Sequence, residues 1–407
     1  MDWIIFGDDW GRHPSTTQHL VSRFQENDRI LWIDSIGMRS PKLSVTDGAR
    51  AIRKLKGMLS GRISPRDLED DSPTTRESGK RSPNRVLMPA ILPWHVRCAE
   101  LNAQILARSI KATSQALGLE DVTILSATPL AALYLDAIPH ARVIYLRLDD
   151  YAKLPGVDAA LVNKIEPVMI ERANLVVATA KKLLPEGWRY PNTRTLYMPQ
   201  GVDFEHFSGR VHEPDPERPT LGFFGLFAEW IDADLIRDVA LAKPGWTLEF
   251  LGPRRHVPES LHAIDNIVFR DAVDYADLPR AIEHWSAAWI PFEVSELTAA
   301  VNPLKLREYL SAGLPTACVE MPEVDFERFS IRRITEASDV ARWLEQLETY
   351  PETVATRLER SRAMRSESWS ARAKLLRQAT ARIAPRGRHV RQEMHTDFSR
   401  RLSYRAR

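Results

Sequence analysis

The segment Asn302-Pro303-Leu304-Lys305-Leu306-Arg307-Glu308-Tyr309-Leu310-Ser311-Ala312-Gly313-Leu314-Pro315 is the most informative part of this chain. Pro303 suits the first position of a helix, and Gly313 suits the cap after its last turn. Lys305 and Glu308 are three residues apart, so both can project from one face near the amino end of the helix. Such a helix end attracts phosphate, and a carboxylate can accept hydrogen bonds from a ribose diol. The segment therefore predicts a seat for a nucleotide diphosphate.

A simpler interpretation of the same helix stays open at this point. Lys305 and Glu308 would then form a solvated ion pair on an amphipathic surface helix, worth about 1 kcal/mol or less. The organisation of the rest of the chain favours the first interpretation.

Short apolar runs alternate with longer helical patterns along the chain. Strands are predicted at 3–6, 30–33, 122–126, 143–147, 175–178, 221–224, 247–251, 267–269, 287–291 and 316–319. Helices are predicted at 16–25, 101–117, 159–172, 233–242, 278–284 and 304–312. This alternation predicts an α/β fold of two doubly wound, Rossmann-like domains with parallel sheets. In such folds ligands bind at the carboxyl ends of the strands, and we expect the two domains to face a central cleft.

A chain of 407 residues is long for a single core. The proline-rich, charged segment 211–219 is the best candidate boundary. We predict an N-terminal domain over 1–207 with a flexible loop at about 61–85, a linker over 208–219 and a C-terminal domain over 220–365. A further helix over 366–385 and a basic, disordered tail over 386–407 complete the chain.

Composition restricts the class of protein. A hydrophobic content of 44% and a charged content of 27% are ordinary for a soluble globular protein. No apolar run is long enough to span a bilayer, and the start resembles a buried strand rather than a signal peptide. Cys98 and Cys318 lack partners at metal-binding spacing, so neither a disulfide framework nor a zinc site is indicated. The expected compartment is the cytoplasm.

Positive charge is concentrated in two segments. Residues 50–66 carry six basic residues and no acidic ones, and 386–407 carry seven arginines against two acidic residues. The first segment could lie on the anionic inner face of a membrane or form a solvated helix, and both alternatives stay open. The remainder has a net charge of about −3, from +2 for the whole chain and +5 for the tail, so nucleic-acid binding is not expected.

The second half of the chain resembles the nucleotide-sugar-dependent glycosyltransferases with two Rossmann-like domains (GT-B), especially the group-1 family. Four segments carry the resemblance, in the family's order over roughly 120 residues. They are Met198-Pro199-Gln200-Gly201-Val202-Asp203-Phe204-Glu205-His206-Phe207, the loop region 221–232, Phe250-Leu251-Gly252-Pro253-Arg254, and the segment 302–315. The resemblance implies that residues 220–365 bind the nucleotide sugar and that the helix over 366–385 crosses back to the first domain.

The resemblance also implies roles for residues in the second half. Glu308 matches the second glutamate of the family's paired-glutamate motif, which grips the ribose, whereas Ala300 stands where the first glutamate is expected. This difference leaves retention or inversion of the sugar's configuration open. The usual basic pair after the first strand of that domain is absent as well. The donor-binding set implied is Gly225, Trp230, Asp232, Arg254, Asn302, Lys305 and Glu308.

A weaker likeness to the xanthan glucuronosyltransferase concerns the first half. In that enzyme a strand-end aspartate is the base and a lysine binds the diphosphate. Asp149 matches the position of the aspartate, and Lys305 matches that of the lysine. We therefore predict Asp149, with Asp150 as second choice, as the general base. A cap or turn role after a strand is the alternative. Adjacent residues of a strand point to opposite faces, so the two aspartates should not share a metal ion, and no metal site is predicted. Acceptor contacts are expected from Gly11, Arg12 and His13.

The resulting hypothesis is a metal-independent glycosyltransferase of bacterial polysaccharide or glycolipid synthesis. It would use a nucleotide-sugar co-substrate, with UDP favoured over GDP, and a saccharide or polyprenyl-linked acceptor. No other cofactor is expected. Two alternatives share the fold: a nucleotide-sugar 2-epimerase, and an inactive sugar-nucleotide-binding scaffold.

Overall fold

The computed structural model describes residues 1–12, 14–36, 81–89, 98–209 and 217–385. The described chain forms two compact units. The first comprises residues 1–179, 183–198 and the part of the chain from 373 onward, and the second comprises 180–182 and 199–372. The predicted basic segment 50–66, the tail over 386–407, His13 and most of the loop at 61–85 lie outside the described residues.

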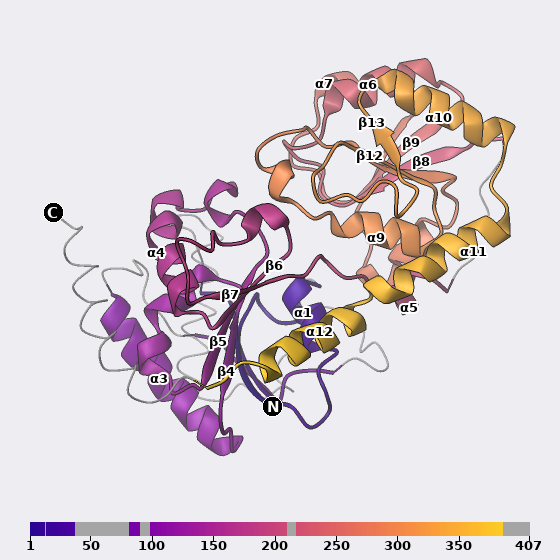
Figure 1. Ribbon diagram of the computed structural model, residues 1–407. Helices are drawn as coiled ribbons and strands as arrows, with labels where there is room; N and C mark the ends of the chain where they lie inside the picture. Colours follow the sequence, from indigo (N-terminus) through magenta and orange to yellow (C-terminus); the bar gives the residue numbers. More distant parts are fainter. Residues whose placement is uncertain (13, 37–80, 90–97, 210–216, 386–407) are drawn as a thin grey trace. The chain divides into compact units, whose positions relative to one another are not determined.

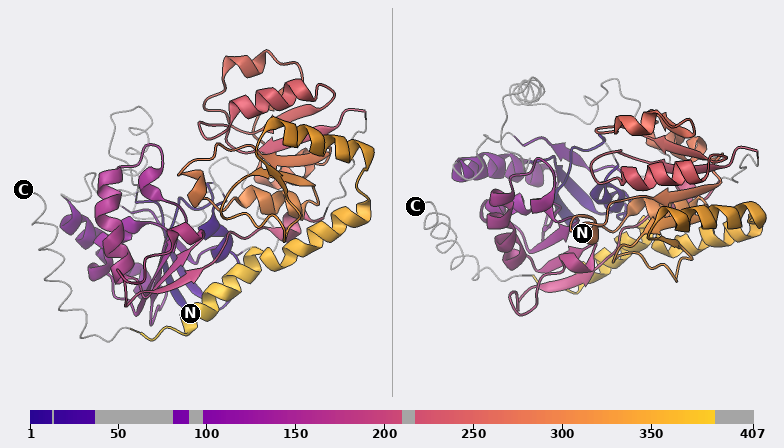
Figure 2. Two further views of the ribbon diagram at one scale, coloured as in Figure 1. Left: turned by 45° about the horizontal axis from the view of Figure 1, so that its top comes forward. Right: turned by 90° about the horizontal axis from the view of Figure 1, so that it is seen from above.

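The first unit contains a seven-stranded parallel sheet in the order β3-β2-β1-β4-β5-β6-β7 (Figure 1). The five strands between its edges, β1, β2, β4, β5 and β6, are buried on both faces, as is typical of a parallel sheet. Helices α3 and α4 cover one face, and α1 and α12 lie on the other (Figures 1 and 2). The bounds are β1 Asp2–Phe6, α1 Thr16–Val21, β2 Arg29–Ile33, β3 Arg85–Leu87, α3 Ala99–Ala116, β4 Thr123–Ser126, β5 Arg142–Arg147, α4 Ala159–Arg172, β6 Leu175–Ala178, β7 Arg194–Tyr197 and α12 Trp369–Ala381.

The second unit contains a six-stranded parallel sheet in the order β10-β9-β8-β11-β12-β13. Helices α6, α7 and α10 pack together on one side, and α5, α9 and α11 pack together on the other (Figure 1). The bounds are α5 Phe204–Phe207, β8 Thr220–Phe224, α6 Ala233–Ala242, β9 Thr247–Leu251, α7 Glu259–His262, β10 Ile267–Arg270, α8 Leu278–Ala281, β11 Ala287–Ile290, α9 Leu304–Ser311, β12 Thr316–Val319, β13 Arg332–Ile334, α10 Ala337–Thr349 and α11 Val354–Ala363.

The predicted α/β architecture of two Rossmann-like units is confirmed. All ten predicted strands are present within a residue or so of their expected ends. The three unpredicted strands, β3, β7 and β13, each occupy an edge of their sheet. Edge strands are short and carry charge, here Arg85, Arg194 and Arg332, so they lack the apolar pattern on which the prediction depended.

The chain enters the second unit earlier than the predicted linker at 208–219. Val202, Phe204 and Phe207 belong to the hydrophobic core of the second unit, so the boundary by contacts lies between Met198 and Pro199. The helix predicted over 366–385 is present as α12, which begins in the second unit and continues in the first.

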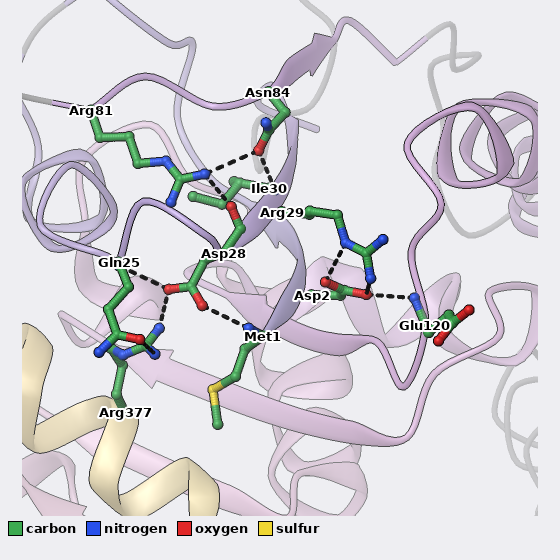
Figure 3. Close-up of polar contacts among 10 residues, drawn as sticks. All are labelled: Met1, Asp2, Gln25, Asp28, Arg29, Ile30, Arg81, Asn84, Glu120 and Arg377. Carbon is green, nitrogen blue, oxygen red and sulfur yellow. Dashed lines mark hydrogen bonds and ion pairs between the residues drawn. The ribbon is translucent and has the colours of Figure 1, made fainter.

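Helix α12 is fixed to the first unit by an ion pair. Arg377 of α12 pairs with Asp28, a carboxylate that is almost completely buried (Figure 3). Gln25 also donates its backbone N–H to this carboxylate, at 2.9 Å. A buried carboxylate needs such partners, so loss of Arg377 would leave part of the Asp28 charge uncompensated.

Candidate functional site

Two glycines at strand ends shape the second unit's candidate site. Gly225 follows β8 with a φ of +126°, and Gly252 follows β9 with a φ of +141°, a region that side-chain-bearing residues rarely adopt. A Cβ atom on Gly252 would lie 2.4 Å from the carbonyl oxygen of Gly225, and one on Gly225 would lie 2.3 Å from Cε of Lys305. The two loops therefore approach closely, and the Lys305 side chain lies directly against the Gly225 backbone.

Helix α9 supplies the charged groups beside this glycine. Glu308 is buried, with 4% of its surface exposed, and Lys305 is half-buried with its Nζ 5.7 Å from the ring centroid of Phe223. Among the ion pairs of the described residues, none joins Lys305 to Glu308, so their charged atoms are more than 4.0 Å apart. The solvated ion pair considered from the sequence is therefore wrong for this helix.

The pKa values of both groups reflect this burial. Burial lowers the pKa of Lys305, against the opposing effect of the Glu308 charge. Burial raises the pKa of Glu308 to about 7; the Lys305 charge opposes this shift and the Asp203 charge adds to it. A lysine and a glutamate that are desolvated without contacting each other suit a ligand that carries both anionic and hydroxyl groups.

Asn302 lies two residues before α9 and is also buried, with 5% of its surface exposed. Its Oδ1 accepts hydrogen bonds from Nη1 of Arg307 at 2.6 Å and from the backbone N–H of Gln200 at 3.3 Å. Its Nδ2 is buried and has no hydrogen-bond partner within the described part of the chain. Because an unsatisfied buried donor is costly, this amide group suits an acceptor on a ligand.

The other predicted donor-binding residues have partners within the protein. Asp232 caps helix α6 by accepting a hydrogen bond from the backbone of Leu235 at 2.9 Å. Arg254 forms an exposed ion pair with Asp271. Trp230 is half-buried and packs against the hydrophobic core. The structure thus brings Gly225 and Lys305 into contact and places Asn302 just before α9 and Glu308 within it. Asp232 and Arg254 are engaged elsewhere.

The first unit presents carboxylates at the carboxyl ends of its central strands. Asp149 lies two residues after β5 and is half-buried. Burial, together with the charges of Asp150 and Asp8, raises the pKa of Asp149 to about 7. Within the described residues, no hydrogen bond or ion pair involves its carboxylate. Asp150 instead pairs with Lys153 at 3.5 Å. A carboxyl group of this pKa is suited to accept a proton near neutral pH.

Two carboxylates that influence these sites were absent from the predicted set. Asp8 follows β1, which is separated from β5 by only one strand, and its charge acts on Asp149. Asp203 is buried and its charge acts on Glu308. The sequence contained a signal for each of these carboxylates. Asp8 follows a predicted strand, and Asp203 lies in the segment after Met198 that resembles the glycosyltransferase family.

The predicted acceptor-side residues lie in the loop after β1. Gly11 has a φ of +78°, and its backbone N–H donates to Oε1 of Gln18 at 3.2 Å. Arg12 is exposed and forms an ion pair with Asp9 at 3.7 Å. His13 lies outside the described residues. An acceptor role for this loop stays a prediction.

The described residues contain neither a metal-binding cluster nor a helix that could span a membrane. No cluster of three or more His, Cys, Asp or Glu side chains there has an arrangement that could hold a metal ion. Likewise, none of the helices in the described ranges combines the length and the apolar character needed to span a bilayer.

Comparison with known proteins found a curated relative and several solved structures of similar fold. No protein-family model matches the chain. The chain is 31% identical over 132 residues to a Bacillus subtilis (strain 168) protein described as "Putative teichuronic acid biosynthesis glycosyltransferase TuaH". This match spans 30% of the chain and 33% of TuaH, so the chain matches about a third of that protein's length.

The solved structures are similar over nearly the whole chain. Anabaena HepE, in complex with UDP and glucose, has a TM-score of 0.58 at 12% identity and covers 93% of this chain and 99% of its own. An E. coli structure described as "Trehalose-6-phosphate from E. coli bound with UDP-2-fluoro glucose" has a TM-score of 0.60 at 10% identity. The match covers 95% of this chain and 100% of the E. coli chain. A sucrose-phosphate synthase of Thermosynechococcus elongatus has a TM-score of 0.57 at 13% identity. The match covers 93% of this chain and 99% of the synthase chain. At these identities the likeness concerns the fold, and it agrees with the GT-B prediction.

Proposed function

We propose that this protein is a glycosyltransferase that moves a sugar from a nucleotide-diphosphate sugar to a hydroxyl group of a saccharide or lipid-linked acceptor. The observation that carries the proposal is the seat at the start of α9. There Lys305, Glu308 and Asn302 are partly or fully buried, and no ion pair joins the lysine to the glutamate. The regional similarity to TuaH and the fold shared with UDP-bound structures support the same activity.

Each group of the seat has a role in this proposal. The Lys305 ammonium, with the amino end of α9, stabilises the negative charge that develops on the leaving diphosphate. Charge stabilisation of this kind requires no metal ion. The Glu308 carboxylate accepts hydrogen bonds from the ribose hydroxyls. Gly225 has no side chain, so Lys305 can lie against its backbone, and the diphosphate would bind beside this contact.

Asp149 is the proposed general base. The acceptor hydroxyl must lose its proton as it attacks the anomeric carbon, and a carboxylate with a pKa of about 7 can accept that proton at neutral pH. Asp150 is the weaker candidate, since its carboxylate already forms an ion pair with Lys153.

UDP is the favoured nucleotide, because the HepE and E. coli neighbours are UDP-bound. Bacterial polysaccharide or glycolipid synthesis is the proposed setting, by analogy with the description of TuaH. We further propose a cytoplasmic location and a peripheral contact with the inner membrane face, for which the basic segment 50–66 is the sequence feature.

A transfer assay tests the proposal. The full chain is incubated with radiolabelled UDP-glucose, UDP-galactose, UDP-glucuronic acid or UDP-N-acetylglucosamine, together with lipid and saccharide extracts of bacterial membranes. We expect label in an acceptor product from at least one donor, and far less of it with Lys305→Ala or Asp149→Asn. Labelled free sugar epimers without acceptor product would favour the epimerase, and binding without turnover would favour the inactive scaffold.

A further inference from the structure

Five residues of the second unit form a closed ring of polar contacts next to the proposed seat: Gln200, Asn302, Arg307, Glu367 and Arg372. The backbone N–H of Gln200 and Nη1 of Arg307 donate to Oδ1 of Asn302, at 3.3 and 2.6 Å. Nε of Arg307 lies 3.6 Å from Oε2 of Glu367, which also accepts from Nη2 of Arg372. Nε of Arg372 donates to the backbone oxygen of Gln200 at 3.5 Å and closes the ring.

The ring lies at the two ends of the second unit's main segment, residues 199–372. Gln200 is the second residue of the second unit's main segment, and Arg372 is its last residue. Arg307 and Glu367 are both at least 94% buried in their side chains, so the ring is an internal feature. Glycine at position 201 allows this packing, because a Cβ atom there would lie 2.6 Å from the ring of Trp369.

The ring fixes the orientation of one side-chain amide. Oδ1 and Nδ2 of an asparagine can be exchanged by a flip of the side chain, and the hydrogen-bond network decides between the two orientations. Two donors converge on Oδ1 of Asn302, so a flip would place the NH₂ group against two N–H groups. Nδ2 is therefore held on the opposite side of the amide, buried and without a hydrogen-bond partner in the described ranges.

We infer that Arg307 is a positioning residue for the nucleotide-sugar donor. It holds Asn302 so that Nδ2 can donate to an oxygen of the diphosphate or sugar, two residues before the helix that carries Lys305 and Glu308. This inference rests on the proposed function. Arg307 lies on a different side of α9 from Lys305, because residues two positions apart in a helix are separated by about 200° around its axis. It contributes to binding through Asn302 and not by contact with the donor.

The ring could instead contribute only to stability, and the matched variant Asn302→Asp separates the two roles. Aspartate keeps an oxygen for Arg307 and Gln200 but replaces Nδ2 by a second oxygen. Calorimetric titration of the full chain with UDP-glucose, with the thermal unfolding midpoint of each variant measured in parallel, gives both readouts. Arg307→Gln removes the guanidinium, and Arg307→Lys retains a cation that can reach Oδ1.

Arg328→Ala is the control, since Arg328 bonds Oε1 of the same Glu367 at 2.7 Å but does not contact Asn302. We expect Asn302→Asp to weaken UDP-glucose binding by about tenfold or more while its unfolding midpoint stays within about 2 °C of the wild type. Arg307→Gln should weaken binding by a similar factor, Arg307→Lys by less, and Arg328→Ala by less than about twofold.

The outcomes distinguish the two proposals. A wild type that binds UDP-glucose, with unchanged affinity in Asn302→Asp and Arg307→Gln, overturns the positioning role and leaves the proposed function standing. A folded wild type that binds neither UDP-glucose nor any of the other UDP-sugars overturns the proposed function and this inference together.

Discussion

Asp149 in the first unit and Glu308 in the second are both carboxyl groups whose pKa is raised to about 7, but their surroundings differ. Burial is the largest cause for each. The like charges of Asp150 and Asp8 raise the pKa of Asp149 further. For Glu308 the cation of Lys305 opposes the rise in pKa, and only the charge of Asp203 adds to it. A carboxylate among like charges is suited to take up a proton, and one beside a cation is suited to stay ionised and accept hydrogen bonds. The same side-chain chemistry thus supports two different roles.

The largest expected effect concerns the base. Asp149→Asn keeps the shape of the side chain but cannot accept the proton, so the rate of sugar transfer should fall by about 10²- to 10⁴-fold. Binding of the donor should change by less than about twofold, because the seat lies in the second unit. Initial rates and donor titrations on the same preparation measure both quantities. Asp150→Asn is the control, and an equal loss in both variants would contradict the assignment of Asp149.

Removal of the Glu308 charge should change stability in a pH-dependent way. The pKa of Glu308 in the folded protein is about 7, above the usual 4.5. Glu308 therefore contributes fully to the free energy of unfolding below pH 4.5, where it is protonated, and this contribution is lost as the pH rises through 7. Without nucleotide, Glu308→Gln should therefore exceed the wild type in free energy of unfolding by about 3 kcal/mol at pH 8, with little difference near pH 4.5. Urea denaturation at several pH values measures this. A variant less stable than the wild type at pH 8 would contradict the burial of an unpaired carboxylate.

The cation of the seat should matter for binding and not for folding. Lys305→Met removes the charge-assisted contact with the diphosphate, and the affinity for the donor should fall by about 10- to 100-fold. The variant should fold at least as well as the wild type, because burial already disfavours the charged form of Lys305. Lys243→Gln is a matched control in the same unit, since Lys243 pairs with Glu348 at 3.0 Å. Equal affinity of the wild type and Lys305→Met would exclude Lys305 from the donor site.

The smallest expected effect tests the like-charge cluster of the first unit. Asp8→Asn removes one of the two negative charges that raise the pKa of Asp149. The acid limb of the pH–rate profile should then move to lower pH by about half a unit, with a similar maximal rate. The profile of kcat/KM between pH 5 and 9 measures this shift. A shift to higher pH, or loss of most of the maximal rate, would show that Asp8 acts in another way.

The sequence was sufficient for the central strands and for the local part of the seat. Strands inside a sheet are buried on both faces, so their apolar runs are visible in the sequence, whereas the edge strands β3, β7 and β13 are short and charged. Lys305 and Glu308 could be predicted because they share one helical turn. The partners of Asn302 could not, because Gln200 lies 102 residues away in the chain. The effect of Asp8 on Asp149 depends likewise on the order of strands in the sheet.

Thermal unfolding with UDP-, GDP-, ADP- and dTDP-sugars tests the central claim most directly. The panel is applied to the wild type, Lys305→Ala and Glu308→Ala, with Lys243→Gln as control. A ligand at about one hundred times its dissociation constant should stabilise the protein by about 2.7 kcal/mol. The proposed seat predicts that UDP-sugars stabilise the wild type and the control, and that the effect is lost in both seat variants. A well-folded wild type that no nucleotide sugar stabilises, or seat variants that respond like the wild type, would contradict it.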